Sequence, residues 1–145
     1  MTTIVYRDGV MAADSRAYAG DKHPIGTKSK LRRLSDGSLL GVSASIPGLP
    51  ESFRRAVEKT GVEADLEAEF DCKALLVKPD GTVWFYNNGP GFTGPLKGEF
   101  FSTGSGEQYA YAAMVMGADA VRAVEVAIEC DAWTKAEICR LTLLD

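Results

Sequence analysis

The sequence contains a single histidine and only three cysteines, and this scarcity excludes several kinds of functional site. The one imidazole, His23, cannot build a multi-histidine metal centre, and it lies far in sequence from Ser105 and in no known nucleophile motif. The cysteines are odd in number and form no CxxC pair, standing at Cys72, Cys130 and Cys139. This pattern favours reduced, buried thiols over a disulfide framework or a zinc site. We therefore expect neither a metal nor another cofactor.

An excess of basic charge is also missing, since 16 Lys and Arg stand against 20 Asp and Glu. The electrostatic footprint of a nucleic-acid-binding protein is therefore absent. No stretch approaches the ~18 apolar residues of a membrane span, and the N-terminus has no basic segment followed by an apolar run. No GxxxxGK phosphate loop occurs. We expect a cytoplasmic protein without nucleic-acid or membrane partners and without ATPase activity of its own.

What is present fits one domain over residues 1–145, because 46% hydrophobic residues can build one core and the length leaves little for a second. Asp-Gly turns predict three hairpins. Their strands are expected at 2–6 and 10–13, at 30–34 and 38–43, and at 72–77 and 82–86. Helical spacing of apolar residues predicts helices at 50–59, 107–117 and 120–132. A long loop at 87–98 and strands at 99–103 and 135–144 complete the prediction, which describes an α+β fold of two antiparallel sheets between helices.

The N-terminus offers a nucleophile. Met1 precedes the small residue Thr2, and a methionine in this context is normally removed. Thr2 would then carry a hydroxyl and a free α-amine, whose pKa of about 8 in unperturbed peptides lies near neutrality. Such an amine can accept the hydroxyl proton and return it to the leaving group. One residue would therefore supply both nucleophile and base.

The register of the first hairpin decides what stands opposite Thr2. A three-residue loop at 7–9 would oppose Thr2 to Asp14 and place both on one face of the sheet. A two-residue turn would instead oppose Thr2 to Ser15 and turn Asp14 to the other face. We expect the three-residue loop, and the predicted site depends on it.

Five motifs resemble β-type proteasome subunits and the bacterial peptidase HslV, which are N-terminal-threonine (Ntn) hydrolases. They are Thr2-Thr3-Ile4-Val5, the Ala-Asp-Ser-Arg-Ala run at 13–17, Lys30-Leu31-Arg32-Arg33-Leu34, Gly104-Ser105-Gly106 before a helix with Tyr109-Ala110, and Asp131 with Thr134. The similarity covers nearly the whole chain in the right order. It implies a four-layer αββα sandwich. The segment 62–70 is too short for the family's second long helix, and the usual further C-terminal structure is missing, so the resemblance is to a trimmed member.

The resemblance also implies roles for single residues. Thr2 would be the nucleophile, Lys30 the cation that lowers the proton affinity around it, and Asp14 the partner of Lys30. Ser105 and Asp131 would form hydrogen bonds near the Thr2 amine. Thr134 would replace the family's serine as a hydroxyl donor.

The same resemblance places the oxyanion hole and the substrate pocket. Backbone N–H groups of Ala44 or Ser45 would stabilise the oxyanion, although relatives carry a glycine there. The first substrate pocket would be lined by Ser43, Ser45 and Ile46 and by the stretch around Tyr18. We expect this pocket to be uncharged, of middle size and selective for apolar side chains.

The function implied is that of a threonine-type peptidase subunit, active on peptides or unfolded proteins within a homo-oligomeric ring that an ATP-dependent unfoldase could feed. Two alternatives remain open at the level of sequence. A small-amide Ntn amidohydrolase would use the same Thr2 chemistry without an enclosed chamber. A noncatalytic scaffold that keeps the fold would retain Met1, since a blocked amine removes the base.

Overall fold

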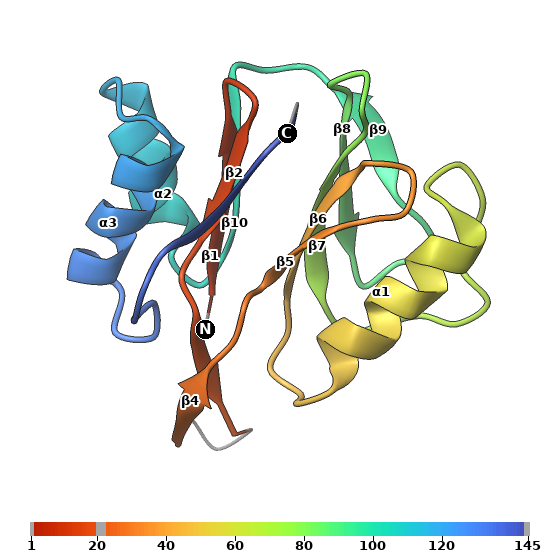
Figure 1. The fold of residues 1–145 in the computed structure, drawn as a ribbon, viewed down its shortest axis with the longest axis horizontal. Coiled ribbons are helices and arrows are strands. Elements are labelled where there is room, and N and C mark those ends of the chain that lie inside the picture. The colour runs from red at the N-terminus through yellow and green to blue at the C-terminus, as the bar shows by residue number, and fades with distance from the viewer. Residues whose placement is uncertain (1, 20–22, 144–145) are drawn as a thin grey trace.

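The computed structural model describes residues 2–19 and 23–143. Two antiparallel sheets face each other, with helices on the outer face of each (Figure 1). The first sheet has the order β10-β1-β2-β11, from β1 (Thr3–Arg7), β2 (Val10–Ala13), β10 (Phe100–Gly104) and β11 (Cys139–Thr142). The second sheet has the order β5-β6-β7-β8-β9, from β5 (Leu31–Arg33), β6 (Leu39–Ser43), β7 (Lys73–Val77), β8 (Val83–Asn87) and β9 (Thr93–Leu96).

Three helices within the described ranges complete the layers. The helices α2 (Glu107–Val115) and α3 (Ala120–Cys130) cover the first sheet, and α1 (Leu49–Thr60) covers the second (Figure 1). A separate two-stranded sheet, β3 (Arg16–Tyr18) with β4 (Pro24–Thr27), extends from the end of the sandwich at which the chain begins (Figure 1). The arrangement confirms the predicted α+β fold of two antiparallel sheets between helices.

The alternation of side chains in β1 explains why the layers stack. Ile4 and Tyr6 point between the two sheets, whereas Val5 points toward α2 and α3, because successive side chains of a strand lie on opposite faces. The layer between the sheets also needs a residue without a side chain. A Cβ atom on Gly41 of β6 would lie 2.7 Å from Cγ2 of Ile4. Gly41 therefore lets the sheets approach closely beside the start of β1.

The first hairpin has a different register from the one predicted. Arg7 pairs with Val10 and Ile4 with Ala13, so the connection is the two-residue turn Asp8-Gly9. Both turn residues have positive φ, 50° for Asp8 and 80° for Gly9, as a type I′ turn requires. The predicted three-residue loop is wrong because the twist of a type I′ Asp-Gly turn already matches that of the two flanking strands.

The other differences concern exposed strands. The stretch 87–98, predicted as a loop, contains the edge strand β9, and the strands β3 and β4 were not predicted. All four residues of both β4 and β9 are exposed, so no buried alternation marked these strands in the sequence. The final strand spans only Cys139–Thr142 of the predicted 135–144. The three hairpins, the three helices and the strand before α2 lie where predicted, and 61–72 contains no helix.

The cysteines divide by exposure. Cys72 is buried, and burial raises the pKa of its thiol to about 12, so this thiol stays protonated and unreactive. Cys139 is half-buried and Cys130 is exposed, which corrects the expectation that all three would be buried. None of the helices in the described ranges is long and apolar enough to cross a membrane.

Candidate functional site

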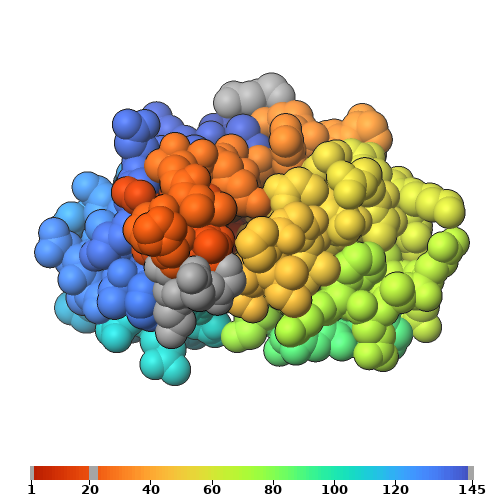
Figure 2. All heavy atoms as spheres, turned by 90° about the horizontal axis from the view of Figure 1, so that it is seen from below, coloured from red at the N-terminus to blue at the C-terminus, as the bar shows by residue number. Residues whose placement is uncertain are grey.

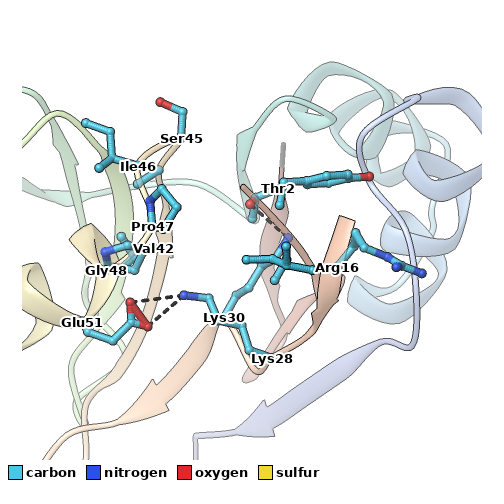
Figure 3. A pocket seen from close by; sticks show the side chains of 15 residues that line it. Thr2, Arg16, Lys28, Lys30, Val42, Ser45, Ile46, Pro47, Gly48 and Glu51 are labelled. Atoms are coloured by element: carbon cyan, nitrogen blue, oxygen red, sulfur yellow. Dashed lines mark hydrogen bonds and ion pairs between the residues drawn. The ribbon is translucent and has the colours of Figure 1, made fainter. Parts of the chain in front are cut away.

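The site forms around Thr2, where the first sheet begins. Thr2 directly precedes β1 and is 4% exposed. The Nζ atom of Lys30, which directly precedes β5, donates a hydrogen bond of 3.1 Å to Oγ1 of Thr2 (Figure 3). The contact arises because β5 and β2 lie near each other across the two sheets. An ammonium group therefore stands beside the hydroxyl of the second residue.

The carboxylate of Asp14 forms an ion pair with the Lys30 ammonium. This carboxylate accepts hydrogen bonds of 3.1 and 3.0 Å from Lys30 Nζ, and the two side chains are only 5% (Lys30) and 0% (Asp14) exposed. The same carboxylate accepts from the backbone N–H groups of Thr3 at 3.0 Å and of Lys135 at 3.1 Å. A buried carboxylate is costly unless it is paired and fully hydrogen-bonded. Here the four hydrogen bonds meet both requirements.

The position of Asp14 corrects the prediction that the site depends on the hairpin loop. With the two-residue turn, Asp14 should have pointed to the opposite face from Thr2, yet it contacts Lys30 beside Thr2. The reason is that β2 ends at Ala13, so strand alternation does not extend to Asp14. Asp14 stands opposite Thr3, and its carboxylate accepts a hydrogen bond of 3.0 Å from the Thr3 N–H group.

Burial sets the electrostatics of Lys30. Removal from water lowers the pKa of its ammonium, and the charge and hydrogen bonds of Asp14 oppose this effect without cancelling it. A cation at hydrogen-bonding distance lowers the proton affinity of a hydroxyl. The arrangement can therefore make Thr2 Oγ1 more nucleophilic.

A second hydrogen-bonded group surrounds the backbone nitrogen of Thr2. The Thr2 N–H group donates to Ser105 Oγ at 3.1 Å, and that hydroxyl donates to Asp131 Oδ2 at 2.6 Å. The hydroxyl of Thr134 donates to the same carboxylate oxygen at 2.5 Å. Burial opposes the ionisation of Asp131, but the hydrogen bonds from Ser105 and Thr134 outweigh it and lower the pKa of this carboxyl. The structure thus brings together all three residues predicted for this position.

Thr3 takes part in the same group, although no pattern in the sequence pointed to it. Its Oγ1 lies 2.7 Å from Thr134 Oγ1, and both side chains are fully buried. Nothing in the sequence separates Thr3 from any other strand threonine, because its partner is 131 positions away.

The Gly104-Ser105-Gly106 segment fits against Thr2 and Thr3 because it lacks side chains at both ends. β10 pairs with β1 and ends at Gly104, opposite Thr3. A Cβ atom would lie 2.0 Å from the Thr2 carbonyl oxygen at Gly104, and 2.1 Å from Thr3 Oγ1 at Gly106. Glycine at these two positions allows the close approach that places Ser105 under the Thr2 nitrogen.

A pocket of about 240 Å³ opens beside Thr2. In the view from that end of the sandwich, the early strands in orange meet the gold segment that leads into α1 (Figure 2). The predicted residues Tyr18, Ser45 and Ile46 line this pocket. Ser43 does not, since it lies in a neighbouring depression with Gly104 and Ser105.

The pocket is not uncharged, which corrects the prediction. Apolar groups line it at Ala17, Ile25, Val42, Ala44, Ile46, Pro47 and Pro50. Lys28, however, crosses the cavity to Glu51, and its Nζ atom lies 2.8 Å from Glu51 Oε2 (Figure 3). Arg16 also contributes to the lining, although its guanidinium points away from the cavity (Figure 3). The ion pair was missed because its partners are 23 positions apart.

Ser45 stands on the pocket wall across from Thr2 (Figure 3), and the preceding residue, Ala44, also lines the pocket. Within residues 2–19 and 23–143, the backbone N–H groups of Ala44 and Ser45 donate to no other residue. They are therefore free to donate hydrogen bonds to an oxygen atom of a bound ligand.

Known structures share this architecture. HslV from Trypanosoma brucei superposes with a TM-score of 0.70 at 17% identity, over 97% of this chain and 98% of that one. BPH from Thiobacillus denitrificans gives a TM-score of 0.61, at 17% identity over 97% of this chain and 95% of that one. Its complex with epoxomicin gives 0.60, at 17% identity over 97% and 96%. No protein-family model and no curated protein sequence matches the chain. The chain therefore has an HslV-like, proteasome-type Ntn-hydrolase fold.

Proposed function

We propose that this chain is a threonine-type peptidase subunit whose nucleophile is Thr2, made N-terminal by removal of Met1. The observation that carries the proposal is the 3.1 Å hydrogen bond from Lys30 Nζ to Thr2 Oγ1, with buried Asp14 behind the lysine. Met1 itself lies outside the described residues. The similarity of fold to HslV, and to BPH in complex with epoxomicin, supports a hydrolase.

In the first chemical step, Thr2 Oγ1 attacks the carbonyl carbon of a peptide bond. The free Thr2 amine accepts the hydroxyl proton, and the Lys30 ammonium stabilises the developing negative charge on the oxygen. As the tetrahedral intermediate collapses, the amine returns the proton to the leaving nitrogen. An ester forms between Oγ1 and the substrate acyl group, and water then hydrolyses this ester to regenerate the hydroxyl.

The groups around the Thr2 nitrogen position that amine. Ser105 lies 3.1 Å from the nitrogen and hydrogen-bonds to the ionised Asp131, which Thr134 also contacts. A carboxylate held through a serine stabilises the ammonium form that arises after the proton is taken up. Ser105, Asp131 and Thr134 therefore orient the base and support its charge.

The backbone N–H groups of Ala44 or Ser45 bind the oxyanion in this proposal. They lie on the wall of the pocket that also contains Thr2, and they are not engaged elsewhere in the described ranges. Preorganised N–H donors aimed at a developing oxyanion typically account for about 10²–10³ in rate.

The substrate is a peptide or an unfolded protein, and the chain acts within a homo-oligomeric ring in the cytoplasm, to which an ATP-dependent unfoldase could deliver substrate. Exposed apolar side chains on and just after α2, among them Val115 and Met116, support assembly, since such patches commonly mark interfaces.

The test combines the mass of the purified protein with peptide cleavage. We expect intact-mass analysis to show loss of Met1 and the wild type to release fluorophore from short peptides. Thr2→Ala should abolish turnover without changing assembly. Thr2→Ser is the matched control, because it keeps a hydroxyl and an amine on one residue and should retain part of the activity.

Different outcomes separate the alternatives. Undiminished cleavage by Thr2→Ala would remove Thr2 from the mechanism. A mature protein that keeps Met1 and cleaves nothing would indicate a noncatalytic scaffold. Turnover of small amides by a monomer, without peptide cleavage, would indicate an amidohydrolase.

A further inference from the structure

The pocket beside Thr2 is crossed by a cation that a substrate can reach. Lys28 lies between β4 and β5, and its Nζ atom contacts Glu51 Oε2 at 2.8 Å and Oε1 at 3.3 Å (Figure 3). The side chains are 38% (Lys28) and 40% (Glu51) exposed. Exposed pairs of this kind contribute little to stability, so a bound side chain can separate them at low cost.

Glu51 and Lys28 differ in how well the rest of the protein stabilises each charge once the pair separates. Glu51 lies in the first turn of α1, where the helix N-terminus stabilises a carboxylate. The hydrogen bond from Lys28 is the main cause that lowers the pKa of Glu51, but the charge of Arg55 lowers it further and remains when the pair separates. Lys28 has no second carboxylate of this kind to stabilise its charge. Glu51 is the only carboxylate among the described residues that line this pocket or the small cavity next to it. Asp14 lies nearby but is buried beneath Lys30 and bound to it.

The charges around the pair reinforce this asymmetry. The small adjoining cavity shares Lys28, Lys30 and Glu51 with the pocket, and it is also lined by Arg32 and Arg54. With Lys30 balanced by Asp14, the lining of the small cavity contains three further cations, Lys28, Arg32 and Arg54, and one carboxylate, Glu51. A basic substrate side chain would enter an excess of positive charge, whereas an acidic one would reduce it.

We propose that this pocket selects an acidic side chain, glutamate, in the residue whose carbonyl group Thr2 attacks, with Lys28 as the residue that determines the specificity. This proposal rests on the proposed peptidase function. The glutamate carboxylate pairs with Lys28, and Glu51 turns toward Arg55 and the solvent. The methylene groups of the bound side chain pack against Ile25, Val42 and Ile46.

The experiment uses fluorogenic peptides that differ only in this residue, which is Glu, Gln, Leu or Lys. We expect the wild type to cleave the Glu peptide with a kcat/KM about tenfold above that of the Gln peptide, as one charge-assisted hydrogen bond would give. The Leu and Lys peptides should also be slower than the Glu peptide. The preference for Glu should shrink as salt is added, because both partners are partly exposed.

Two variants move the preference in opposite directions. Lys28→Met should lower the Glu to Leu ratio of kcat/KM by about tenfold, and Glu51→Gln should raise it, because it releases Lys28 from its competitor. Lys59→Met is the matched control, since it removes the same charge from an exposed pair with Glu67. Its Glu to Leu ratio should equal that of the wild type. If circular dichroism shows that Lys28→Met does not fold, the Glu to Leu ratio of Glu51→Gln alone tests the proposed specificity.

Faster cleavage of the Leu or Lys peptide than of the Glu peptide by the wild type would overturn this specificity. An unchanged ratio in Glu51→Gln would do the same. Loss of all cleavage in Thr2→Ala would still uphold the peptidase in either case. If the wild type cleaves no peptide at all, both proposals fail together.

Discussion

At the scale of single residues, the Asp14 carboxylate is the group on which most of the site converges. It receives the Lys30 ammonium and the backbone N–H groups of Thr3 and Lys135 while fully buried. These bonds fix the Lys30 ammonium beside Thr2 before any substrate binds. Because the charges are already in place, the proposed mechanism needs little reorganisation when negative charge develops on the Thr2 oxygen.

We predict that Lys30→Met lowers peptide cleavage by about a hundredfold or more, because it removes the cation that stabilises that charge. Asp14 keeps its two backbone donors in this variant but loses its ion-pair partner, so we expect a folded protein with a lower midpoint of thermal unfolding. Initial rates and thermal unfolding of the variant, beside Lys59→Met as a control for charge loss, provide the check. Near-normal cleavage by a folded Lys30→Met protein would exclude Lys30 from the site.

Asp131 gives a prediction for stability in acid. Its pKa is lower in the folded protein than its ordinary value of 3.8, so the unfolded chain binds the proton more readily. The stabilisation is therefore present above about pH 4 and is lost as the pH falls through the folded-state pKa. Asp131→Asn should have a lower midpoint of unfolding at pH 7, and its midpoint should decline less between pH 5 and 3. Parallel pH profiles for both proteins would contradict this role.

The sequence predicted the residues of the site better than their contacts. Resemblance to a family identified six site residues, and the structure brings them into two adjoining groups. The six are Thr2, Asp14, Lys30, Ser105, Asp131 and Thr134. Thr3 and the ion pair of Lys28 with Glu51 were missed. Both depend on distances between segments far apart in the chain, which no local pattern of residue types encodes.

At the scale of elements, the loop between β10 and α2 shows how a strand end is fitted to its neighbour. Gly106 has an ordinary φ of −95°, so glycine is needed there for space and not for backbone conformation. A methyl group would press on the hydroxyl oxygens of Thr3 and Thr134. The hydrogen bond between those two hydroxyls therefore depends on the absence of a side chain at Gly106.

We predict that Gly106→Ala destabilises the protein by about 1–3 kcal/mol through overpacking. It should also reduce peptide cleavage, because the loop that carries Ser105 must shift away from Thr2. Gly89→Ala is the matched control, since the nearest atom to its added Cβ lies 3.8 Å away. Denaturant unfolding of both variants measures the difference. Equal stability of the two would show that the loop adapts without cost.

Helices and strands that bury one face were easier to predict from the sequence than exposed ones. Hairpins with an Asp-Gly turn and helices with a buried face were located correctly, because the periodicity of their apolar residues reports packing. The strands β3, β4 and β9 escaped prediction, because they bury too little to produce a periodic pattern. The predicted register of the first hairpin was wrong for a different reason. Two turn geometries fit the same Asp-Gly sequence, and only the pairing of the whole strands distinguishes between them.

At the scale of the whole molecule, one apolar surface is left uncovered on α2. Val115 is 61% exposed, and Met116, just beyond the helix, is 88% exposed, with Tyr109 and Tyr111 partly exposed on the same element. The opposite side of α2 packs on α3 and the first sheet. The exposed side is therefore available for contact with another subunit, as ring assembly requires.

We predict that sedimentation velocity of the wild type shows a species several times the mass of one chain. The double variant Val115→Glu with Met116→Glu should shift the population toward the monomer, because charged side chains oppose burial in an interface. The midpoint of unfolding should change little at high dilution, since neither residue is buried. A peptide-cleaving monomer would contradict the predicted ring.

The proposed catalytic site also depends on residues that are translated long after Thr2. The partners of its opening residues are 103, 121 and 131 positions downstream, in the contacts Thr2 with Ser105, Asp14 with Lys135 and Thr3 with Thr134. A nascent polypeptide still attached to the ribosome, or a prematurely terminated one, has a leading threonine but no Asp131 or Thr134 to complete its surroundings. The proposed peptidase activity therefore cannot begin before residues 131–135 have been synthesised and have folded against the start of the first strand.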